Sequence, residues 1–175
     1  MIRHDRNDHG FTLIELLIVV AIISIIAAIA VPGLLRSKMT ANETSAAISL
    51  RTTAASQVLY ATSCGSGGFA ATYLILGTAP PGSTDAFIGA DLGGTATPSK
   101  AGYNFTLGPG AGSAAGPNDC NGTATITSYY ATAVPATFGS SGSRSFAVNQ
   151  GNVVWELNAA TAPTEPLGPP AKPVQ

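Results

Sequence analysis

The sequence predicts an α+β fold in which one long N-terminal helix precedes an antiparallel β-sheet of about four strands. Two observations favour this class. Residues 11–31 form an apolar run, and a helical rhythm of polar and apolar residues continues from there to about residue 61. Segments between residues 102 and 158 have the alternation, and the aromatic and threonine content, of strands. The length of 175 residues suits one domain plus an anchor.

The apolar run is long enough to cross a membrane. Its only charged residue between Phe11 and Val31 is Glu15. In a helix these residues span about 31 Å, roughly the thickness of the hydrocarbon core of a bilayer. A carboxylate near the centre of that core costs at least ~2.5 kcal/mol, so Glu15 needs a partner and a function. Nothing else in the chain offers an obvious partner, and we therefore expect it on another copy of the same chain.

The helix is expected to continue to about Ala61, for a length of ~75 Å. Pro32 removes one intrahelical hydrogen bond and predicts a kink or local melting; a simple break at the exit from the membrane explains it equally well. Residues 34–63 form an amphipathic half whose apolar stripe is expected to pack on a globular head. The predicted polar stripe contains Lys38, Asn42, Ser45, Ser49, Thr52 and Ser56. The predicted apolar stripe contains Ala47, Ile48, Leu50, Ala54, Ala55, Val58 and Leu59.

Residues 64–101 are expected to form a connecting region. The glycines that follow Cys64 provide a helix C-cap, because glycine readily adopts positive φ. The remainder is rich in Gly, Ala, Pro and Thr, which predicts a mostly irregular loop with one short helix or strand. Asp85 and Asp91 could ligate calcium, but two isolated acids do not make a site, so we expect solvated loop charges.

Residues 102–158 are expected to form the sheet. The first predicted strand covers residues 102–107, and the second covers residues 123–133 after a loop over 108–121. Residues 144–148 and 153–157 are predicted to pair as a hairpin across the turn-forming group 149–152. From residue 159 to 175 repeated prolines make regular structure improbable, and this tail is expected to be extended or disordered.

Both cysteines lie beyond the anchor. An even count in an exported domain predicts one disulfide between Cys64 and Cys120, although two free thiols are the alternative. The bridge would join the end of the helix to the sheet. The loop it closes corresponds to a stabilisation of about 4 kcal/mol in the entropic treatment, which strain can reduce.

Composition argues against several function classes. The net charge is −1 and 10% of residues are charged, so no basic surface exists to bind nucleic acid. Outside the anchor the acids, namely Glu43, Asp85, Asp91, Asp119, Glu156 and Glu165, are scattered without motif spacing. We predict no catalytic residues, no metal site and no cofactor, and therefore no enzyme.

The N-terminal segment resembles that of type IV prepilins and of the related pseudopilins of type II secretion. The matching features are a short polar leader over residues 1–10 that ends in Gly10, then Phe11-Thr12-Leu13-Ile14-Glu15, an apolar stretch, and Pro32-Gly33 at its end. The later segments Gly102-Tyr103-Asn104-Phe105, Tyr129-Tyr130-Ala131 and 142–148 also resemble pilin heads. The Trp-Gly and Pro-Tyr segment associated with the major type II secretion pseudopilin has no counterpart, which favours a pilus subunit.

This resemblance implies processing, a fold and partners. A membrane-embedded prepilin peptidase would cut between Gly10 and Phe11, and Phe11 would become the methylated N-terminus. His4 and His9 lie in the segment removed, so the mature chain would contain no histidine. The distal half of the long helix would carry the antiparallel sheet of a pilin fold.

The implied location changes with assembly. The chain would span the inner membrane once before assembly, through residues 11–33, and would then join an extracellular homopolymeric filament, or pilus, through the pilus assembly machinery. Our hypothesis is that the Phe11 amine of one subunit neutralises Glu15 of a neighbour, which would also select the axial register. Pro32 would lie in a segment that can extend during assembly.

Other interpretations remain open at this stage. The chain could be a minor pilin, or a pseudopilin of a secretion system. Alternatively, residues 1–30 could be an ordinary secretory signal cleaved after Ala30, which would release a soluble periplasmic binding module beginning at Val31. A plain single-pass anchor without an assembly role is a further alternative.

Overall fold

The computed structural model describes residues 11–174. They form two compact units, the first ending at Ser37 and the second beginning at Lys38. One helix, α1, runs from Leu13 to Ser63 and contributes to both units. Its end is closed as expected at the glycines after Cys64, where the Gly65 N–H donates to the Tyr60 carbonyl at 2.7 Å and Gly67 has φ of +89°.

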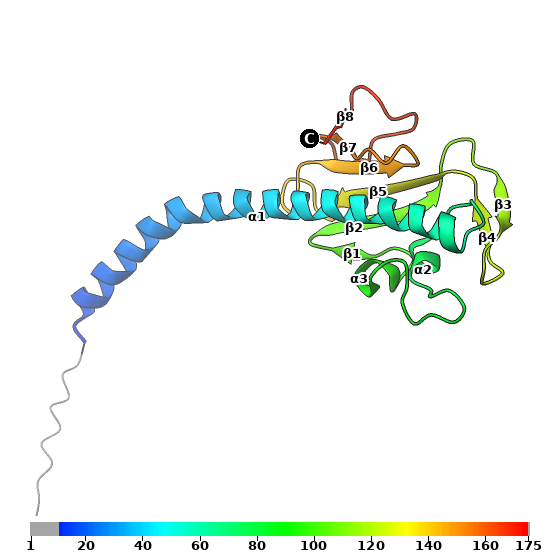
Figure 1. Ribbon diagram of the computed structural model, residues 1–175. Helices are drawn as coiled ribbons and strands as arrows, with labels where there is room; N and C mark the ends of the chain where they lie inside the picture. Colours follow the sequence, from blue (N-terminus) through cyan, green and yellow to red (C-terminus); the bar gives the residue numbers. More distant parts are fainter. Residues whose placement is uncertain (1–10, 175) are drawn as a thin grey trace, which may run out of the picture. The chain divides into compact units, whose positions relative to one another are not determined.

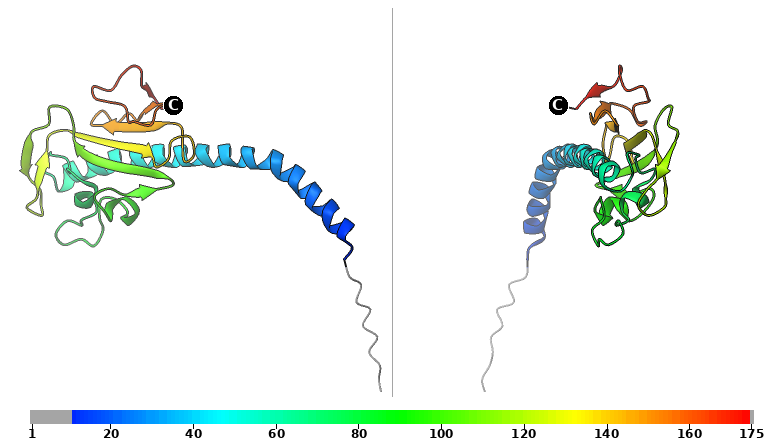
Figure 2. Two further views of the ribbon diagram at one scale, coloured as in Figure 1. Left: turned by 180° about the vertical axis from the view of Figure 1, so that it is seen from behind. Right: turned by 45° about the vertical axis from the view of Figure 1, so that its right-hand side comes forward.

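The second unit is built on an antiparallel sheet of six strands in the order β1-β2-β5-β6-β7-β8. Figure 1 shows the second half of α1 lying along one face of this sheet, and Figure 2 shows the same layers from behind. The predicted α+β class is confirmed, with more strands than expected because both edge strands are very short. The strands are β1 (Ser99–Lys100), β2 (Tyr103–Pro109), β5 (Tyr129–Pro135), β6 (Ser145–Asn149), β7 (Trp155–Leu157) and β8 (Lys172–Pro173).

A separate two-stranded sheet corrects one part of the prediction. It pairs β3 (Ala115–Asn118), which lies in the predicted loop 108–121, with β4 (Ala124–Ile126). The predicted single strand 123–133 is therefore two strands in different sheets. The division follows from tertiary contact, because Phe69 and Ile126 exchange backbone hydrogen bonds of 2.8 and 3.0 Å that hold β4 beside the connecting region. The predicted hairpin of β6 and β7 is confirmed.

The connecting region contains more structure than the one short element expected. It forms two short helices, α2 (Tyr73–Leu76) and α3 (Ala90–Gly93). Thr72 caps α2 by accepting a hydrogen bond from the Ile75 N–H. The two helices approach closely at Gly77 and Gly93, where a Cβ on Gly77 would lie 2.1 Å from the Gly93 carbonyl oxygen. Both helices thus depend on glycine at this contact.

Only part of the predicted apolar stripe of α1 faces the head. Ala47, Leu50 and Ala54 are buried there, among inward-facing strand residues such as Phe105 and Phe146. Ile48, Ala55, Val58 and Leu59 are instead exposed, while Ser49 and Ser56 of the predicted polar stripe are buried. The predicted orientation of this half of the helix is therefore wrong in part.

The buried polar side chains of α1 bind backbone groups of the connecting region. Gln57 is fully buried, and its amide donates to the Ala70 carbonyl at 2.8 Å and accepts from the Ala70 N–H at 2.9 Å. The Ser56 hydroxyl donates to the Phe87 carbonyl at 2.8 Å. An irregular buried segment has backbone groups that no ladder satisfies, and these side chains satisfy them. Hydrogen bonding therefore decided which face of α1 is buried.

The C-terminal tail is ordered up to Val174, which corrects the expectation of an extended or disordered segment. Strand β8 pairs with β7, and the Val174 N–H donates to the Val154 carbonyl at 2.8 Å. The Glu165 carboxylate accepts hydrogen bonds from the Ala111 N–H and from the Asn149 amide, at 2.5 and 2.9 Å. The prolines of the tail therefore shape a loop that returns to the sheet.

We predict that Gln57→Leu lowers the free energy of unfolding by about 2–5 kcal/mol, because it leaves the buried N–H and carbonyl of Ala70 unpaired. Urea unfolding of the full chain in detergent, followed by fluorescence of the single tryptophan, Trp155, measures this change. Thr52→Leu on the exposed face of the same helix is the matched control and should change the value by less than about 0.5 kcal/mol. Equal effects of the two substitutions would contradict the assigned role of Gln57.

Candidate assembly site

The first half of α1 is an apolar surface that nothing else in residues 11–174 covers. Its most apolar stretch of 18 residues is fully exposed. The large side chains are exposed along its length, from Phe11 at 85% to Leu35 at 56%. By length and composition this is the one helix in the described part of the chain that could cross a membrane. Such a surface needs lipid or other helices around it.

Glu15 has a hydrogen-bonding partner in its own chain, which the sequence prediction missed. Its carboxylate accepts from the Thr12 N–H at 3.0 Å and from the Thr12 hydroxyl at 2.7 Å. The Glu15 N–H in turn donates to the Thr12 hydroxyl oxygen at 3.3 Å. This is a capping box, and the spacing Thr12-x-x-Glu15 before an apolar run was the sequence signal for it.

Thr12 supplies hydrogen bonds to Glu15 but no positive charge. Within residues 11–174 no cation forms an ion pair with the Glu15 carboxylate. The carboxylate is thus fixed in direction at the start of the helix, while its charge is uncompensated. The need for a counter-charge from outside this part of the chain therefore stays a prediction.

The other predicted assembly residues are placed as follows. Phe11 precedes the helix and is exposed, whereas Gly10, on the other side of the predicted cleavage point, lies outside the described residues. Pro32 lies inside α1, and the helix assignment continues through it without a break. The local melting considered for Pro32 is therefore absent from the structure, and its role during assembly stays a prediction.

Comparison with known proteins agrees with the resemblance of the N-terminal segment to type IV prepilins. Residues 5–31 match the family model of the prokaryotic N-terminal methylation motif. The chain is also 62% identical over 39 residues to the type IV wide pilus major component PilA4 of Thermus thermophilus, a match that covers 22% of this chain and 30% of the relative. The chain therefore spans less than a third of that relative's length in the match. No solved structure matches.

Both matches agree with the type IV pilin family that the N-terminal residues resemble, although they cover a minority of the chain. The recognition made from the N-terminal residues is thereby supported, and the long helix with an antiparallel sheet agrees with it.

The head is held to the end of α1 by a disulfide. The predicted bridge between Cys64 and Cys120 is present, with a Cα–Cα distance of 4.8 Å. Beside it, the Tyr60 hydroxyl donates to the Asp119 carboxylate at 2.7 Å, and the same carboxylate accepts from the Thr123 N–H. Burial, followed by the neighbouring Asp119, raises the pKa of Tyr60 far above its ordinary value, so the phenol stays protonated as a donor. The bridge and this bond together fix β4 to the helix end.

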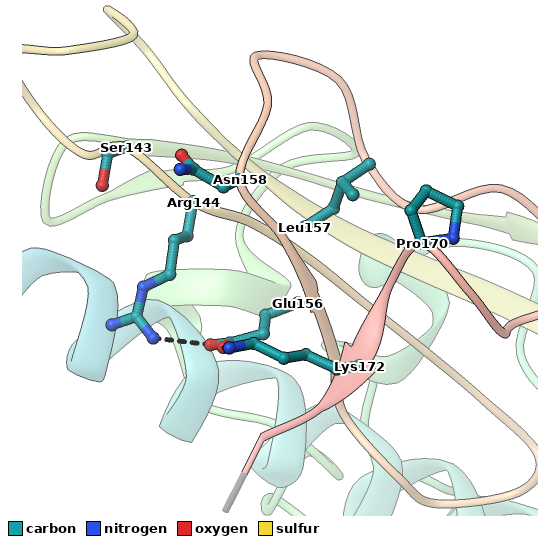
Figure 3. Close-up of a pocket in the computed structure, with 7 residues that line it drawn as sticks. All are labelled: Ser143, Arg144, Glu156, Leu157, Asn158, Pro170 and Lys172. Carbon is teal, nitrogen blue, oxygen red and sulfur yellow. Dashed lines mark hydrogen bonds and ion pairs between the residues drawn. The ribbon is translucent and has the colours of Figure 1, made fainter.

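A charged cluster joins the other end of the head to α1. Glu43 of α1 accepts hydrogen bonds from the Ser143 N–H at 2.7 Å and from the Arg144 Nε at 2.9 Å. Arg144 also pairs with Glu156 of β7 at 2.5 Å, and Lys172 of β8 lies 3.4 Å from the same carboxylate. Figure 3 shows Arg144 and Lys172 converging on Glu156. The pocket drawn there is lined by Ser143, Arg144, Glu156, Leu157, Asn158, Pro170 and Lys172.

The electrostatics of this cluster favour a structural role. Two carboxylates and two cations balance one another across the cluster. Burial alone would raise the pKa of Glu43, but the hydrogen bonds from Ser143 and Arg144 outweigh it and hold this pKa below its ordinary value. Burial opposes the charge of Arg144, yet the pairing with Glu43 and Glu156 holds its pKa above normal. Sequence spacing gave no signal for the cluster, because its members come from four separate segments.

The two acids considered for calcium are not brought together into a metal site. Asp91 forms an ion pair with Lys100 at 2.7 Å, and this hydrogen bond lowers the pKa of Asp91. Residues 11–174 contain no group of three or more His, Cys, Asp or Glu side chains that could hold a metal ion. Asp85 lies exposed on the loop between α2 and α3.

We predict that the head loses stability in acid through Glu43. The pKa of Glu43 is lower in the folded state than in the unfolded chain, where it is ~4.3. The contribution of Glu43 to the free energy of unfolding is therefore complete above the unfolded-state pKa and is lost as pH falls through the folded-state pKa. Glu43→Gln should lower the free energy of unfolding by about 3 kcal/mol at pH 7, since Arg144 loses a buried partner. The free energy of unfolding of this variant, measured by urea titration, should also decline less steeply between pH 5 and pH 3 than that of the wild type. Asp85→Asn is the control, and a wild-type pH slope in Glu43→Gln would contradict the prediction.

Proposed function

We propose that this pilin is a structural subunit of an extracellular, type IV pilus-like helical filament. The observation that carries the proposal is the uncovered apolar surface of α1, which bears the methylation motif at its start and a compact disulfide-bonded head at its other end. Such a surface is stable in lipid before assembly and among the helices of other copies afterwards. The match to a relative whose name describes a major component of a wide pilus supports a homopolymeric filament.

Processing would convert the membrane-held chain into an assembly-competent one. A prepilin peptidase cuts between Gly10 and Phe11, the new terminus is methylated, and the head remains outside the inner membrane until the assembly machinery extracts the subunit. The methylated amine of Phe11 then carries a positive charge four residues from Glu15. No catalytic step by the pilin itself and no nucleic acid is part of this proposal.

Glu15 would select the register between subunits. Its carboxylate is directed by the Thr12 capping box, so only a neighbour at the correct height brings a Phe11 amine to it. Neutralisation of the two charges removes most of the cost of burying either one among apolar helices. The apolar side chains between Leu13 and Val31 then contribute the remaining affinity.

The N-terminus of the mature protein tests the processing step. We expect mass spectrometry of the protein from its native membrane to show N-methylated Phe11 as the first residue. An intact Met1 would indicate a plain anchor, and a first residue at Val31 would indicate release by signal peptidase. Either of these results contradicts the proposed function.

We predict that Glu15→Gln and Glu15→Ala leave the pilin processed and membrane-bound but reduce its incorporation into filaments severalfold or more, because the Phe11 amine loses its counter-charge. Sheared-filament yield relative to the membrane pool measures the effect. Ser24→Ala is the matched control, since the Ser24 hydroxyl only donates to the Val20 carbonyl of its own helix, at 2.7 Å. Normal assembly by either Glu15 variant would count against the register mechanism.

A further inference from the structure

The second half of α1 carries an exposed stripe that faces away from the head, which we call the outer stripe. Its residues follow a helical period and are all exposed. Its three large apolar members are Ile48, Val58 and Leu59, with exposed fractions of 54%, 43% and 54%. The complete stripe is Ala41, Thr44, Ile48, Arg51, Thr52, Ala55, Val58, Leu59 and Thr62.

The hydroxyl groups of the outer stripe are already satisfied within the helix. Thr44, Thr52 and Thr62 each donate to a carbonyl four residues earlier, at distances of 2.9, 3.1 and 3.0 Å. Their methyl groups therefore add to the apolar area, and burying this face would leave no hydroxyl unpaired. The exception is Arg51, whose guanidinium has no hydrogen bond or ion pair within residues 11–174. A partner that covers the stripe must supply a negative charge.

Asp85 is an acid that could supply this negative charge, because its carboxylate has no partner in the described part of the chain. Across residues 11–174 the carboxylates of Glu15, Glu43, Asp91, Asp119, Glu156 and Glu165 each accept a hydrogen bond or ion pair from another side chain or from a backbone N–H. Asp85 lacks such a contact for its carboxylate in the same part of the chain; only its backbone groups bond, to the Ser83 hydroxyl. Arg51 and Asp85 thus both face solvent, on different parts of the same head.

The axial position of Asp85 along α1 limits which cation of a neighbouring copy it can contact. Phe87, two residues later, accepts a hydrogen bond from Ser56 through its carbonyl, and its ring lies edge-on to Tyr60 with centroids 5.2 Å apart. Two residues reach at most about 7 Å, so Asp85 lies near this turn of the helix. Counted along α1, the turn is five to nine residues beyond Arg51, or about 7–13 Å.

A second copy displaced toward its head end along the second half of α1 brings its Arg51 toward the level of Asp85 on the first copy. The displaced copy thus supplies the cation of this pair, and its neighbour supplies the anion.

We propose that the outer stripe packs against a second copy of this chain in the filament, with Arg51 of one copy paired to Asp85 of the adjacent copy. The inference rests on the proposed function and names a second contact between adjacent copies, at the level of the heads. Lys38 is also exposed and forms no ion pair among residues 11–174, but it lies about 20 Å along the helix from Arg51. It therefore serves as a matched cation for the test.

Charge reversal in cells that carry the variant as their sole copy tests the pair. Arg51→Glu and Asp85→Arg should each reduce the sheared-filament yield at least about tenfold, because each brings like charges together in a buried contact. The double variant Arg51→Glu/Asp85→Arg should return to within about threefold of wild type. Lys38→Glu alone should assemble to within about threefold, and Lys38→Glu/Asp85→Arg should assemble no better than Asp85→Arg.

A cysteine pair gives a readout independent of yield. Arg51→Cys/Asp85→Cys removes both charges together, and mild oxidation of its filaments should produce a ladder of covalent multimers that neither single variant forms. The native cysteines are bonded to each other and do not interfere. Wild-type trypsin resistance of the head in detergent shows that each variant is folded.

The outcomes separate this inference from the proposed function. Absence of filaments from the wild-type chain would contradict the proposed function itself. With wild-type filaments present, normal assembly by both single reversals would overturn the Arg51–Asp85 pair. So would rescue by Lys38→Glu instead of Arg51→Glu, or absence of the covalent ladder. Rescue by the double reversal together with the ladder supports it.

Discussion

The fold depends on the hydrogen bonds between the inner face of α1 and the irregular segments that pack on it. Gln57 binds both backbone groups of Ala70, Ser56 binds the Phe87 carbonyl, and Tyr60 binds Asp119. A connecting region with two four-residue helices cannot satisfy its own buried backbone, so the helix must do it. This requirement turns the small polar side chains of α1 inward and leaves Ile48, Val58 and Leu59 outside. The same bonds thus hold the head together and expose the outer stripe.

The parts that depend on local sequence were predictable. The apolar run, the end of the helix at the glycines after Cys64, and the β6–β7 hairpin all follow from patterns within a few residues. The disulfide followed from the cysteine count and from an exported domain. The Thr12-x-x-Glu15 capping box was also local, and its pattern was available although the prediction passed over it.

The parts that depend on contacts between distant segments were not predictable. Thr127 and Ser128 contain nothing that breaks a strand, and only the bridge between Phe69 and Ile126 explains why β4 and β5 separate. The cluster of Glu43, Arg144 and Glu156 assembles across about a hundred residues of sequence, so no spacing rule could find it. The orientation of the distal half of α1 was misjudged for a related reason. Polarity indicates which residues tolerate water, but it does not show which ones meet an unpaired backbone group.

The edges of the six-stranded sheet also bear on the proposed filament, in which the heads would lie at high local density. The outermost strands, β1 and β8, are two residues long, and each carries a lysine; Pro173 in β8 also lacks a backbone donor. Short, charged, proline-containing edges resist the addition of a strand from another molecule, which is the route to amyloid-like aggregates. Heads built in this way can crowd together without fusing through their sheets. In the proposed filament, self-association would then be left to helical surfaces, whose geometry would keep it ordered.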